Sequence, residues 1–231
     1  TTPRSSRRSR AVSARRWSAS TLPTSPPRTA SQIVAGSPRV GILALQGDVR
    51  EHALVLTSLG ADVALVRRPA ELAQVEGLVI PGGESSVIDK LVRMFGMQQP
   101  LRDRIAAGMP VYGTCAGLIM LADRIEGAIA GQEALGGIDV TVQRNAFGTQ
   151  AESFETMIDV PLLGAPPVHA VFIRAPIVSS VGPAATAFMT LDDGRIVGVE
   201  QGNLLGTSFH PEVSGETRLH ERFLSKVRAR A

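Results

Sequence analysis

Short apolar runs alternate with segments of helical period between residues 40 and 121 of this sequence. A continuous apolar run is typical of a strand that is buried on both faces, because a half-exposed strand alternates apolar and polar residues. Repeated alternation of such strands with helices predicts an α/β fold in which helices cover both faces of a mostly parallel sheet. The predicted strands are residues 40–45, 63–66, 77–80 and 110–113.

The spacing of apolar residues also predicts helices. The first is expected to begin at an N-cap, Asp48, and to end before Gly60. The helix faces expected to be buried are, in chain order, Val49, Ala53 and Leu56; Val87, Leu91 and Phe95; Leu118 and Leu121; and Leu219, Phe223 and Val227. The second half has further strand-like runs, some of which are expected to form an antiparallel edge or flap, at residues 140–142, 157–160, 170–173 and 196–199.

Residues 1–38 differ in composition from the rest of the chain. They are rich in Ser, Arg, Pro and Thr and show no helical or strand period, so we expect a disordered extension before a single domain at residues 39–231. An Arg-rich, Ser-rich segment without acidic residues matches an organellar transit peptide. A start site placed too far upstream explains the same composition equally well.

The excess of positive charge also belongs to this extension. Eight arginines precede Val40, and without them 16 basic residues stand against 21 acidic ones, so the predicted domain is mildly acidic and binding to nucleic acid is disfavoured. No apolar run approaches the roughly 18 residues that span a bilayer, so we expect no contact with a membrane. The single cysteine excludes an intramolecular disulfide and favours a reducing compartment, the cytoplasm or an organelle interior.

That cysteine lies in the segment Gly-Thr-Cys-Ala-Gly at residues 113–117, between a predicted strand and a predicted helix. Small residues around a nucleophile permit a tight, strained turn that presents its side chain at the carboxyl end of the sheet. The N-terminus of the following helix favours a thiolate. A buried structural cysteine is the alternative. The flanking glycines favour the nucleophile, Cys115.

A thiolate nucleophile needs a group that transfers protons, and the sequence has four histidines. His52 lies in the middle of the first predicted helix, and we expect His169 and His220 to be surface or packing residues. His210 belongs to the segment Phe-His-Pro-Glu at residues 209–212. The proline is expected to keep the backbone extended, so that the Glu212 carboxylate lies on the same side and orients the imidazole. The predicted catalytic triad is Cys115, His210 and Glu212.

A third loop, Pro-Gly-Gly-Glu-Ser-Ser at residues 81–86, follows another predicted strand. Its glycines allow the backbone to approach a substrate, and their N–H groups can stabilise an oxyanion. Ser85 or Ser86 is expected to cap the next helix. An ordinary glycine turn is equally consistent with this segment alone. All three loops follow strands, at the edge where open α/β sheets bind their ligands.

Together, these three segments resemble the class I (triad) glutamine amidotransferases. Three further segments make the sequence similar to the glutaminase subunits of pyridoxal 5′-phosphate synthases. They are Leu-Gln-Gly-Asp at 45–48, Arg-Asn-Ala-Phe-Gly at 144–148 and Phe-Ile-Arg-Ala-Pro at 172–176. The resemblance extends from Arg39 to the terminal helix. Within the class, a glutaminase of another pathway is the alternative, and a catalytically silent binding protein on the same scaffold is the alternative outside it.

The resemblance implies a flavodoxin-like three-layer α/β sandwich that hydrolyses L-glutamine to L-glutamate and ammonia without a cofactor or metal. Cys115 would attack the amide, the backbone N–H groups of Gly83 and Ala116 would hold the oxyanion, and His210 would transfer protons. The residues that would bind glutamine are Gly83, Glu84, Ser85, Arg144, Ile173 and Arg174. An arginine suits a carboxylate because its fork bonds both oxygens.

The resemblance also implies a partner, the (β/α)₈-barrel synthase subunit that receives the ammonia. Gln46 would lie at that interface and help to switch on the glutaminase. The sequence departs from the family pattern at Ser86, where threonine is commoner, at Thr149, where many relatives have arginine or another small polar residue, and in the extension. None of these departures affects the triad.

Overall fold

The computed structural model describes residues 36–146 and 153–230. The predicted extension therefore lies outside the described residues up to residue 35, as do Phe147, Gly148 and Thr149. In the described ranges, no helix has both the length and the apolar character that crossing a bilayer requires.

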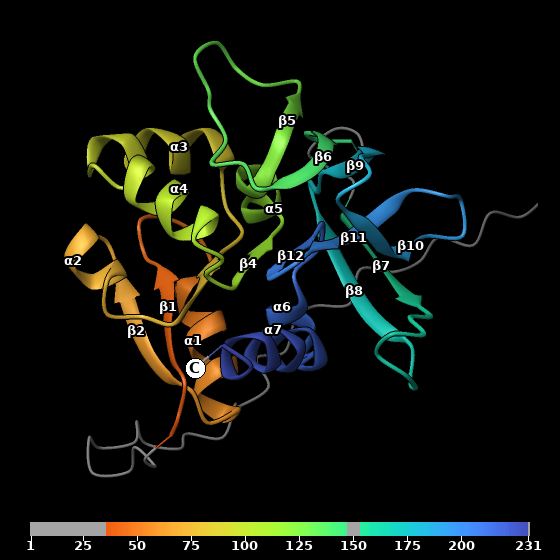
Figure 1. Ribbon diagram of the computed structural model, residues 1–231. Coiled ribbons are helices and arrows are strands. Elements are labelled where there is room, and N and C mark those ends of the chain that lie inside the picture. Colours follow the sequence, from red (N-terminus) through yellow and green to blue (C-terminus); the bar gives the residue numbers. More distant parts are fainter. Residues whose placement is uncertain (1–35, 147–152, 231) are drawn as a thin grey trace, which may run out of the picture. The chain divides into compact units, whose positions relative to one another are not determined.

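A twisted sheet occupies the middle of the fold (Figure 1). Five neighbouring strands form its parallel half, in the order β2-β1-β3-β4-β12. Their bounds are β1 (Arg39–Leu43), β2 (Asp62–Val66), β3 (Gly77–Ile80), β4 (Val111–Thr114) and β12 (Leu204–Thr207). The last three are completely buried along their length, which explains why their sequences do not alternate. The four strands predicted in this part of the chain are thus β1 to β4.

The predicted antiparallel edge is also present. Beyond β12 the sheet continues through β11, β9, β6 and β5, and β10 pairs with β11. All of these pairs are antiparallel except the one between β5 and β6. The bounds are β5 (Ala122–Glu126), β6 (Ile138–Gln143), β9 (Ile177–Val181), β10 (Thr186–Thr190) and β11 (Ile196–Gln201). A separate antiparallel pair comprises β7 (Ser153–Ile158) and β8 (Val168–Ile173).

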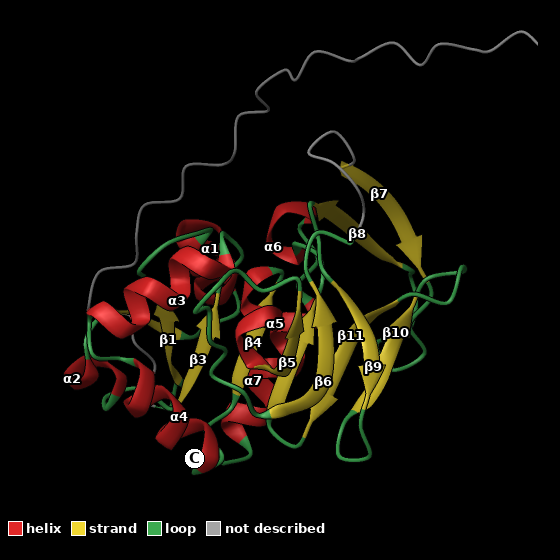
Figure 2. Cartoon of the chain, turned by 90° about the horizontal axis from the view of Figure 1, so that it is seen from above, coloured by secondary structure: helices red, strands yellow, loops and turns green. Residues whose placement is uncertain are grey.

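Helices cover both faces of the sheet, as Figure 2 shows. On one face, α1 (Val49–Ser58) and α7 (Arg218–Arg228) contribute to an apolar core. On the other, a second core includes residues of α2 (Pro69–Leu72), α3 (Ser85–Met94), α4 (Gln98–Ala106) and α5 (Ala116–Leu121). A single helical turn, α6 (Pro211–Ser214), follows β12. The predicted fold, a three-layer α/β sandwich with a mostly parallel sheet, is confirmed.

The predicted buried stripe of α3 is wrong. Val87 and Phe95 are each 40% exposed, whereas the buried residues of this helix are Ser85, Ile88, Asp89 and Val92. Asp89 tolerates burial because its carboxylate accepts hydrogen bonds from Arg93 and from the backbone N–H of Glu133. A prediction of the buried face from apolar residues alone excludes positions such as Asp89, whose carboxylate is buried and paired.

The expected caps agree with the structure only in part. Ser85 and Ser86 are the first helical residues of α3, and the N-cap is Glu84, whose carboxylate accepts from the N–H of Ser86. Asp48 does occupy the N-cap position of α1, but its side chain makes no capping hydrogen bond. A residue distant in the sequence, His210, is the partner of this side chain instead. The elements α2, α4, β5, β9 and β10 have no counterpart among the predictions.

Candidate active site

The carboxyl ends of three neighbouring parallel strands, β3, β4 and β12, bring the three predicted loops together. A cavity of about 260 Å³ opens there. Its lining residues are Gln46, Asp48, Gly83, Glu84, Cys115, Asn145, Ile173, Arg174, His210 and Val213. Six of these are residues that the sequence predicted for the active site, and Gln46 was predicted for the partner interface. Asp48, Asn145 and Val213 were missed.

Cys115 lies between β4 and α5, with a backbone φ of 49° and only 6% of the residue exposed. The glycines on either side are required by close packing. A Cβ on Gly113 would lie 2.4 Å from the carbonyl oxygen of Gly117, and one on Gly117 would lie 2.0 Å from that of Ile80. The Cys115 N–H donates to Thr207 O at 2.8 Å, which ties the turn to β12. The strained strand-to-helix turn expected from the sequence is therefore present.

Backbone strain concentrates around this cavity. Within the described residues, three non-glycine residues have a positive φ, and all three line it: Cys115, Asn145 and Arg174. Such conformations cost about 1–3 kcal/mol each and persist only where the surrounding structure imposes them. Their location on three separate loops is typical of a site that holds its groups in fixed positions.

His210 follows β12, and its Nδ1 lies 2.8 Å from Glu212 Oε1. The predicted contact is present, but the predicted extended backbone is wrong. Pro211 is the first residue of α6, where its missing N–H is no loss, so a helical turn brings Glu212 back to the imidazole. The backbone N–H of His210 also donates to Val171 O on β8 at 3.1 Å.

Asp48 is a second carboxylate at this imidazole. Its Oδ2 lies 3.2 Å from His210 Nδ1, which is the longer-range partner that takes the side chain away from capping α1. Gly82 makes room for this arrangement, since a Cβ there would lie 2.3 Å from His210 Cε1. Nothing in the local sequence around Asp48 distinguishes this role from that of an ordinary helix cap.

These neighbours decide the charge of His210. Burial alone would lower its pKa, but hydrogen bonds to Asp48, Cys115 and Glu212 outweigh burial and raise the pKa to about 12. Burial raises the pKa of Glu212, and the hydrogen bond to His210 opposes that rise. The Cys115 thiol is thus a hydrogen-bond partner of a charged imidazole ring.

The ligand atoms of three side chains, Asp48, His210 and Glu212, lie within 4.8 Å of one another. This spacing would also allow a metal ion to bind. A metal would need a neutral imidazole, whereas the contacts here favour the protonated one. The donor set therefore fits a charged hydrogen-bond cluster better than a metal centre.

Gln46 contacts the loop after β3. Its Oε1 accepts from the N–H of Glu84 at 2.9 Å, and a Cβ on Gly83 would lie 2.4 Å from the same oxygen. A Cβ on Gly83 would therefore force the Gln46 side chain to move, and the φ of 154° at Gly83 is one that other residues rarely adopt. The side chain expected at the partner interface is thus also part of the cavity wall.

Two of the predicted glutamine-binding residues do not line the cavity. Arg144 Nη2 is paired with Glu84 Oε1 at 2.8 Å, and its Nη1 donates to Gln132 Oε1. Ser85 is buried, and its hydroxyl accepts from Gln132 Nε2 at 3.0 Å. Arg144 therefore pairs with Glu84, Ser85 contacts Gln132, and neither residue lines the cavity.

The other three histidines lie in two different settings. His169 is exposed and paired with Glu155 on β7, consistent with the expected surface role. His52 and His220 are completely buried, and His52 Nδ1 lies 2.9 Å from His220 Nε2. Burial lowers the pKa of His52 well below its usual value and lowers that of His220 to about 4. Both imidazoles are neutral near pH 7.

This buried pair predicts a pH-dependent stability. Between about pH 6.5 and 4 an unfolded histidine binds a proton that folded His220 does not, so the free energy of unfolding should fall as the pH falls through this window. The free energy of unfolding can be measured with urea at several pH values. Its dependence on pH should be steeper in the wild type than in His220→Gln by up to about 1.4 kcal/mol per pH unit. Glu212 changes the free energy of unfolding with pH in the opposite direction. Because Glu212 is present in both proteins, its contribution cancels when they are compared. Equal slopes would contradict the prediction.

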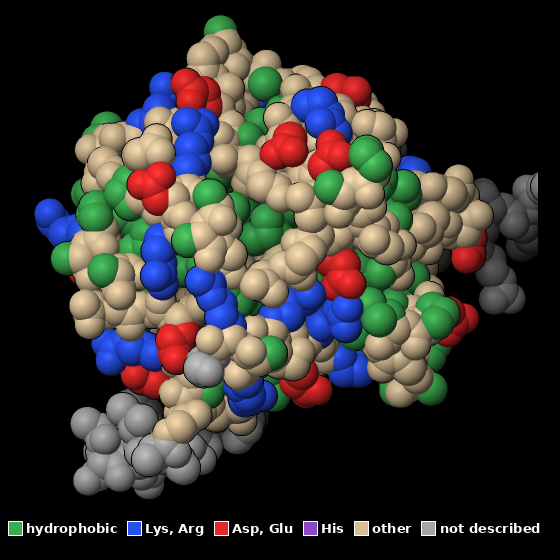
Figure 3. Space-filling model, in the orientation of Figure 1, with side chains coloured by type: hydrophobic (Ala, Val, Ile, Leu, Met, Phe, Trp, Pro, Cys, Tyr) green, Lys and Arg blue, Asp and Glu red, His purple; other side chains and the backbone are tan. Residues whose placement is uncertain are grey.

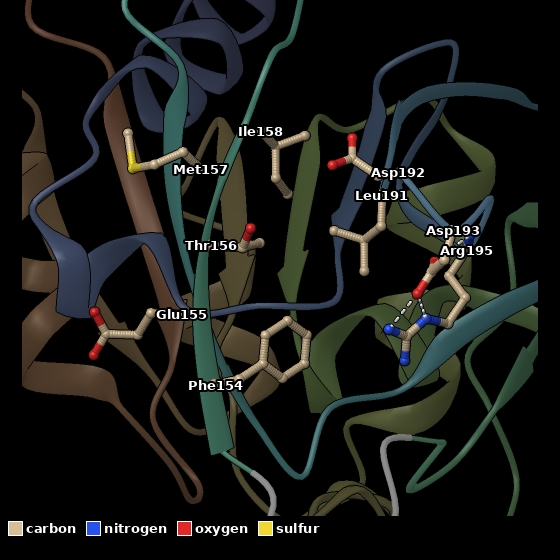
Figure 4. A pocket seen from close by; sticks show the side chains of 9 residues that line it. All are labelled: Phe154, Glu155, Thr156, Met157, Ile158, Leu191, Asp192, Asp193 and Arg195. Atoms are coloured by element: carbon tan, nitrogen blue, oxygen red, sulfur yellow. Dashed lines mark hydrogen bonds and ion pairs between the residues drawn. The ribbon is translucent and has the colours of Figure 1, made fainter. Parts of the chain in front are cut away.

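A second cavity, of about 280 Å³, lies between β7 and the turn that joins β10 to β11 (Figure 4). Its lining residues are Phe154, Glu155, Thr156, Met157, Ile158, Leu191, Asp192, Asp193 and Arg195. None of them is a cysteine or histidine. On the face seen in Figure 3, basic and acidic side chains are mixed rather than gathered in a patch of one sign.

Comparisons with known proteins identify similar sequences. The model of the SNO glutamine amidotransferase family matches residues 42–229. Relatives named pyridoxal 5′-phosphate synthase subunit PdxT include one from Leifsonia xyli, 69% identical over 85% of this chain and 100% of the relative. Another, from Streptomyces avermitilis, is 58% identical, and the match covers 84% of this chain and 96% of that relative.

Solved structures give the same result. One described as a glutamine amidotransferase is 44% identical, with a TM-score of 0.76, and the match covers 81% of this chain and 98% of that one. PurLQS from Thermotoga maritima has a TM-score of 0.57 at 17% identity, with 82% of this chain and 98% of that chain covered, and shares the fold.

Proposed function

The chain belongs to the SNO glutamine amidotransferase family, and from that membership we propose how its residues act. It is the glutaminase subunit of a pyridoxal 5′-phosphate synthase, and its hydrolysis of L-glutamine supplies ammonia for vitamin B6 synthesis. The observation that carries the assignment to residues is the position of Cys115, at a strained turn beside a His210 that two carboxylates keep protonated.

The reaction begins with attack of the Cys115 thiolate on the side-chain amide carbon of glutamine. The negative charge that develops on the amide oxygen is held by the N–H groups of Gly83 and Ala116. The His210 imidazolium then gives its proton to the leaving nitrogen, and ammonia departs from a thioester. The neutral imidazole next takes a proton from water, which attacks the thioester, releases glutamate and restores the thiolate and imidazolium. Glu212 orients His210 throughout.

Binding of glutamine involves opposite charges at the rim of the cavity. The guanidinium of Arg174, which lines the cavity, suits the substrate carboxylate, and the carboxylate of Glu84 suits its ammonium group. Arg144 and Ser85 hold Glu84 and Gln132 in place behind this contact. Ile173 supplies an apolar wall.

The ammonia passes to a (β/α)₈-barrel synthase subunit in a hetero-oligomer, with Gln46 at the interface between the two. A cytoplasmic location is proposed because a reactive thiol persists in a reducing compartment. Support for the partner comes from the relatives, which are named as subunits of pyridoxal 5′-phosphate synthase.

Gln46→Ala should reduce the stimulation of glutaminase activity by the synthase subunit about tenfold, the loss that corresponds to one hydrogen bond of about 1.4 kcal/mol. The amide of Gln46 holds the Glu84 N–H in the loop that includes Gly83, so its loss frees that loop. The measurement is glutamate release against the concentration of synthase. Gln99→Ala, which removes an exposed amide bonded to Asp103, is the matched control. An unchanged stimulation in Gln46→Ala would remove this residue from the interface.

The proposed function is tested by glutamate release from L-glutamine, with and without a purified synthase subunit. Release that rises with the partner supports both the chemistry and the pathway. Release that the partner does not change would leave the glutaminase and overturn the pathway. No release under either condition would favour a catalytically silent protein on this scaffold.

A further inference from the structure

The buried face of α1 contacts the proposed triad from behind. We propose that His52 is a positioning residue for Glu212, and that it holds this carboxylate ionised so that His210 remains protonated beside Cys115. This inference rests on the proposed function and adds to it a residue that neither lines the cavity nor belongs to the triad.

The contact is between completely buried groups. His52 Nε2 lies 3.6 Å from Glu212 Oε2, and both side chains are 0% exposed. Oε2 has no hydrogen-bond partner in the described part of the chain, although Oε1 of the same carboxylate is bonded to His210. A buried carboxylate oxygen without a donor is costly, so a positive or N–H-bearing neighbour stabilises it. His52 is placed to supply that N–H group.

The charge of Glu212 favours one position for the proton of His52. Nε2 faces two oxygens, Glu212 Oε2 and Thr114 Oγ1, the latter at 3.1 Å. A lone pair on Nε2 would face the carboxylate and repel it, so the favoured tautomer has the proton on Nε2. His52 Nδ1 is then the acceptor, and His220 Nε2 donates to it. The direction of donation therefore runs from α7 through α1 toward the triad.

The other groups around His52 leave this arrangement in place. His220 and Tyr112 are buried, and their rings pack edge to face. Burial lowers the pKa of both histidines, and burial raises that of Tyr112, so all three are neutral near pH 7. Asp48, four residues before His52 along the chain, faces His210 rather than His52. The charge of His210 also acts on His52 and lowers its pKa further. Thr114 Oγ1 is the nearer oxygen to Nε2, and Glu212 is the negatively charged group that faces this nitrogen.

The effect on the nucleophile follows from these charges. An N–H group directed at a carboxylate favours its ionised form, and an ionised Glu212 favours the imidazolium form of His210. Removing the N–H group should weaken both effects, so that less of Cys115 is present as thiolate at a given pH. His52→Leu removes the group. His52→Gln keeps an amide nitrogen near the position of Nε2 and should restore it.

The experiment measures the rate at which iodoacetamide alkylates Cys115 as a function of pH, in the full-length chain. In His52→Leu the midpoint of the profile should move up by about one pH unit, which makes alkylation about tenfold slower below it. His52→Gln should lie near the wild type. His220→Gln is the matched control, because it changes the other imidazole of the same buried pair but keeps an amide that can donate to His52 Nδ1. It should lower thermal stability comparably without moving the midpoint.

A profile of His52→Leu that coincides with the wild type, or one that His220→Gln reproduces, would overturn the proposal and leave His52 a packing residue. If His52→Leu does not fold, His52→Asn takes its place, because its amide lies near Nδ1 and not near Nε2. Alkylation needs neither glutamine nor the synthase subunit. Failure of the wild type to hydrolyse glutamine would therefore count against the proposed function and leave this test intact. In the active complex, the loss should appear in kcat rather than in KM.

Discussion

Cys115→Ala should abolish glutamine hydrolysis, with a loss in kcat on the order of 10⁵- to 10⁶-fold, the size found when the nucleophile of a hydrolase triad is removed. Alanine has no group that can form the thioester, and the N–H groups proposed for the oxyanion would have no covalent intermediate to stabilise. The measurement is glutamate release at saturating glutamine with the synthase subunit present.

The fold should survive this change. The Cys115 N–H bond to Thr207 is made by the backbone, so alanine keeps the link between β4 and β12. Thermal unfolding and binding to the synthase should therefore match the wild type. Residual hydrolysis near the wild-type rate would show that another group attacks the amide and would remove Cys115 from the mechanism.

His210→Asn should be nearly as damaging, with a loss in kcat of about 10⁴-fold or more, because members of a triad act as a unit. The asparagine amide can still donate to Glu212 from near the position of Nδ1, but no nitrogen remains at the position of Nε2 to transfer a proton. The variant should also lack the imidazolium, whose pKa is raised to about 12 in the wild type.

Two measurements separate these effects in His210→Asn. Glutamate release reports proton transfer, and alkylation of Cys115 near neutral pH reports the thiolate, which should decline when the positive charge is removed. His169→Asn is the control, because the side chain of this histidine is paired with Glu155 on β7 rather than with a member of the triad. Equal alkylation rates in His210→Asn and the wild type would show that His210 does not activate the thiol.

Much of the fold could be predicted because the parallel strands are buried on both faces and need a continuous apolar run. The runs at β1, β3 and β4 have that property, and the loops that follow them had the residue types that catalysis requires. The site was predictable where local sequence dictates local shape, as at Gly113 and Gly117, whose neighbours leave no room for a Cβ.

Other features depend on contacts between distant parts of the chain. Asp48 occupies a cap position by sequence, and only the folding of β12 beside β4 brings His210 to its carboxylate. His52 resembles any residue of an amphipathic helix until α7 places His220 against it. The contact between His210 and Glu212 was predicted from an extended backbone that the chain does not adopt. Periodicity reports which face is apolar, but not which polar group finds a partner inside.

The strand order also bears on when the enzyme becomes competent during synthesis. β12 lies between β4 and β11, and Thr207 pairs with Thr114 in parallel register. A nascent chain on the ribosome therefore contains its thiol well before the strand that delivers the base has been made, and until then one edge of β4 has no neighbour. Insertion of β12 fills that edge and assembles the triad in the same event. A truncated translation product that lacks β12 would also lack the residues that follow it, including His210. It could not hydrolyse glutamine, so it would release no ammonia where no synthase is ready to receive it.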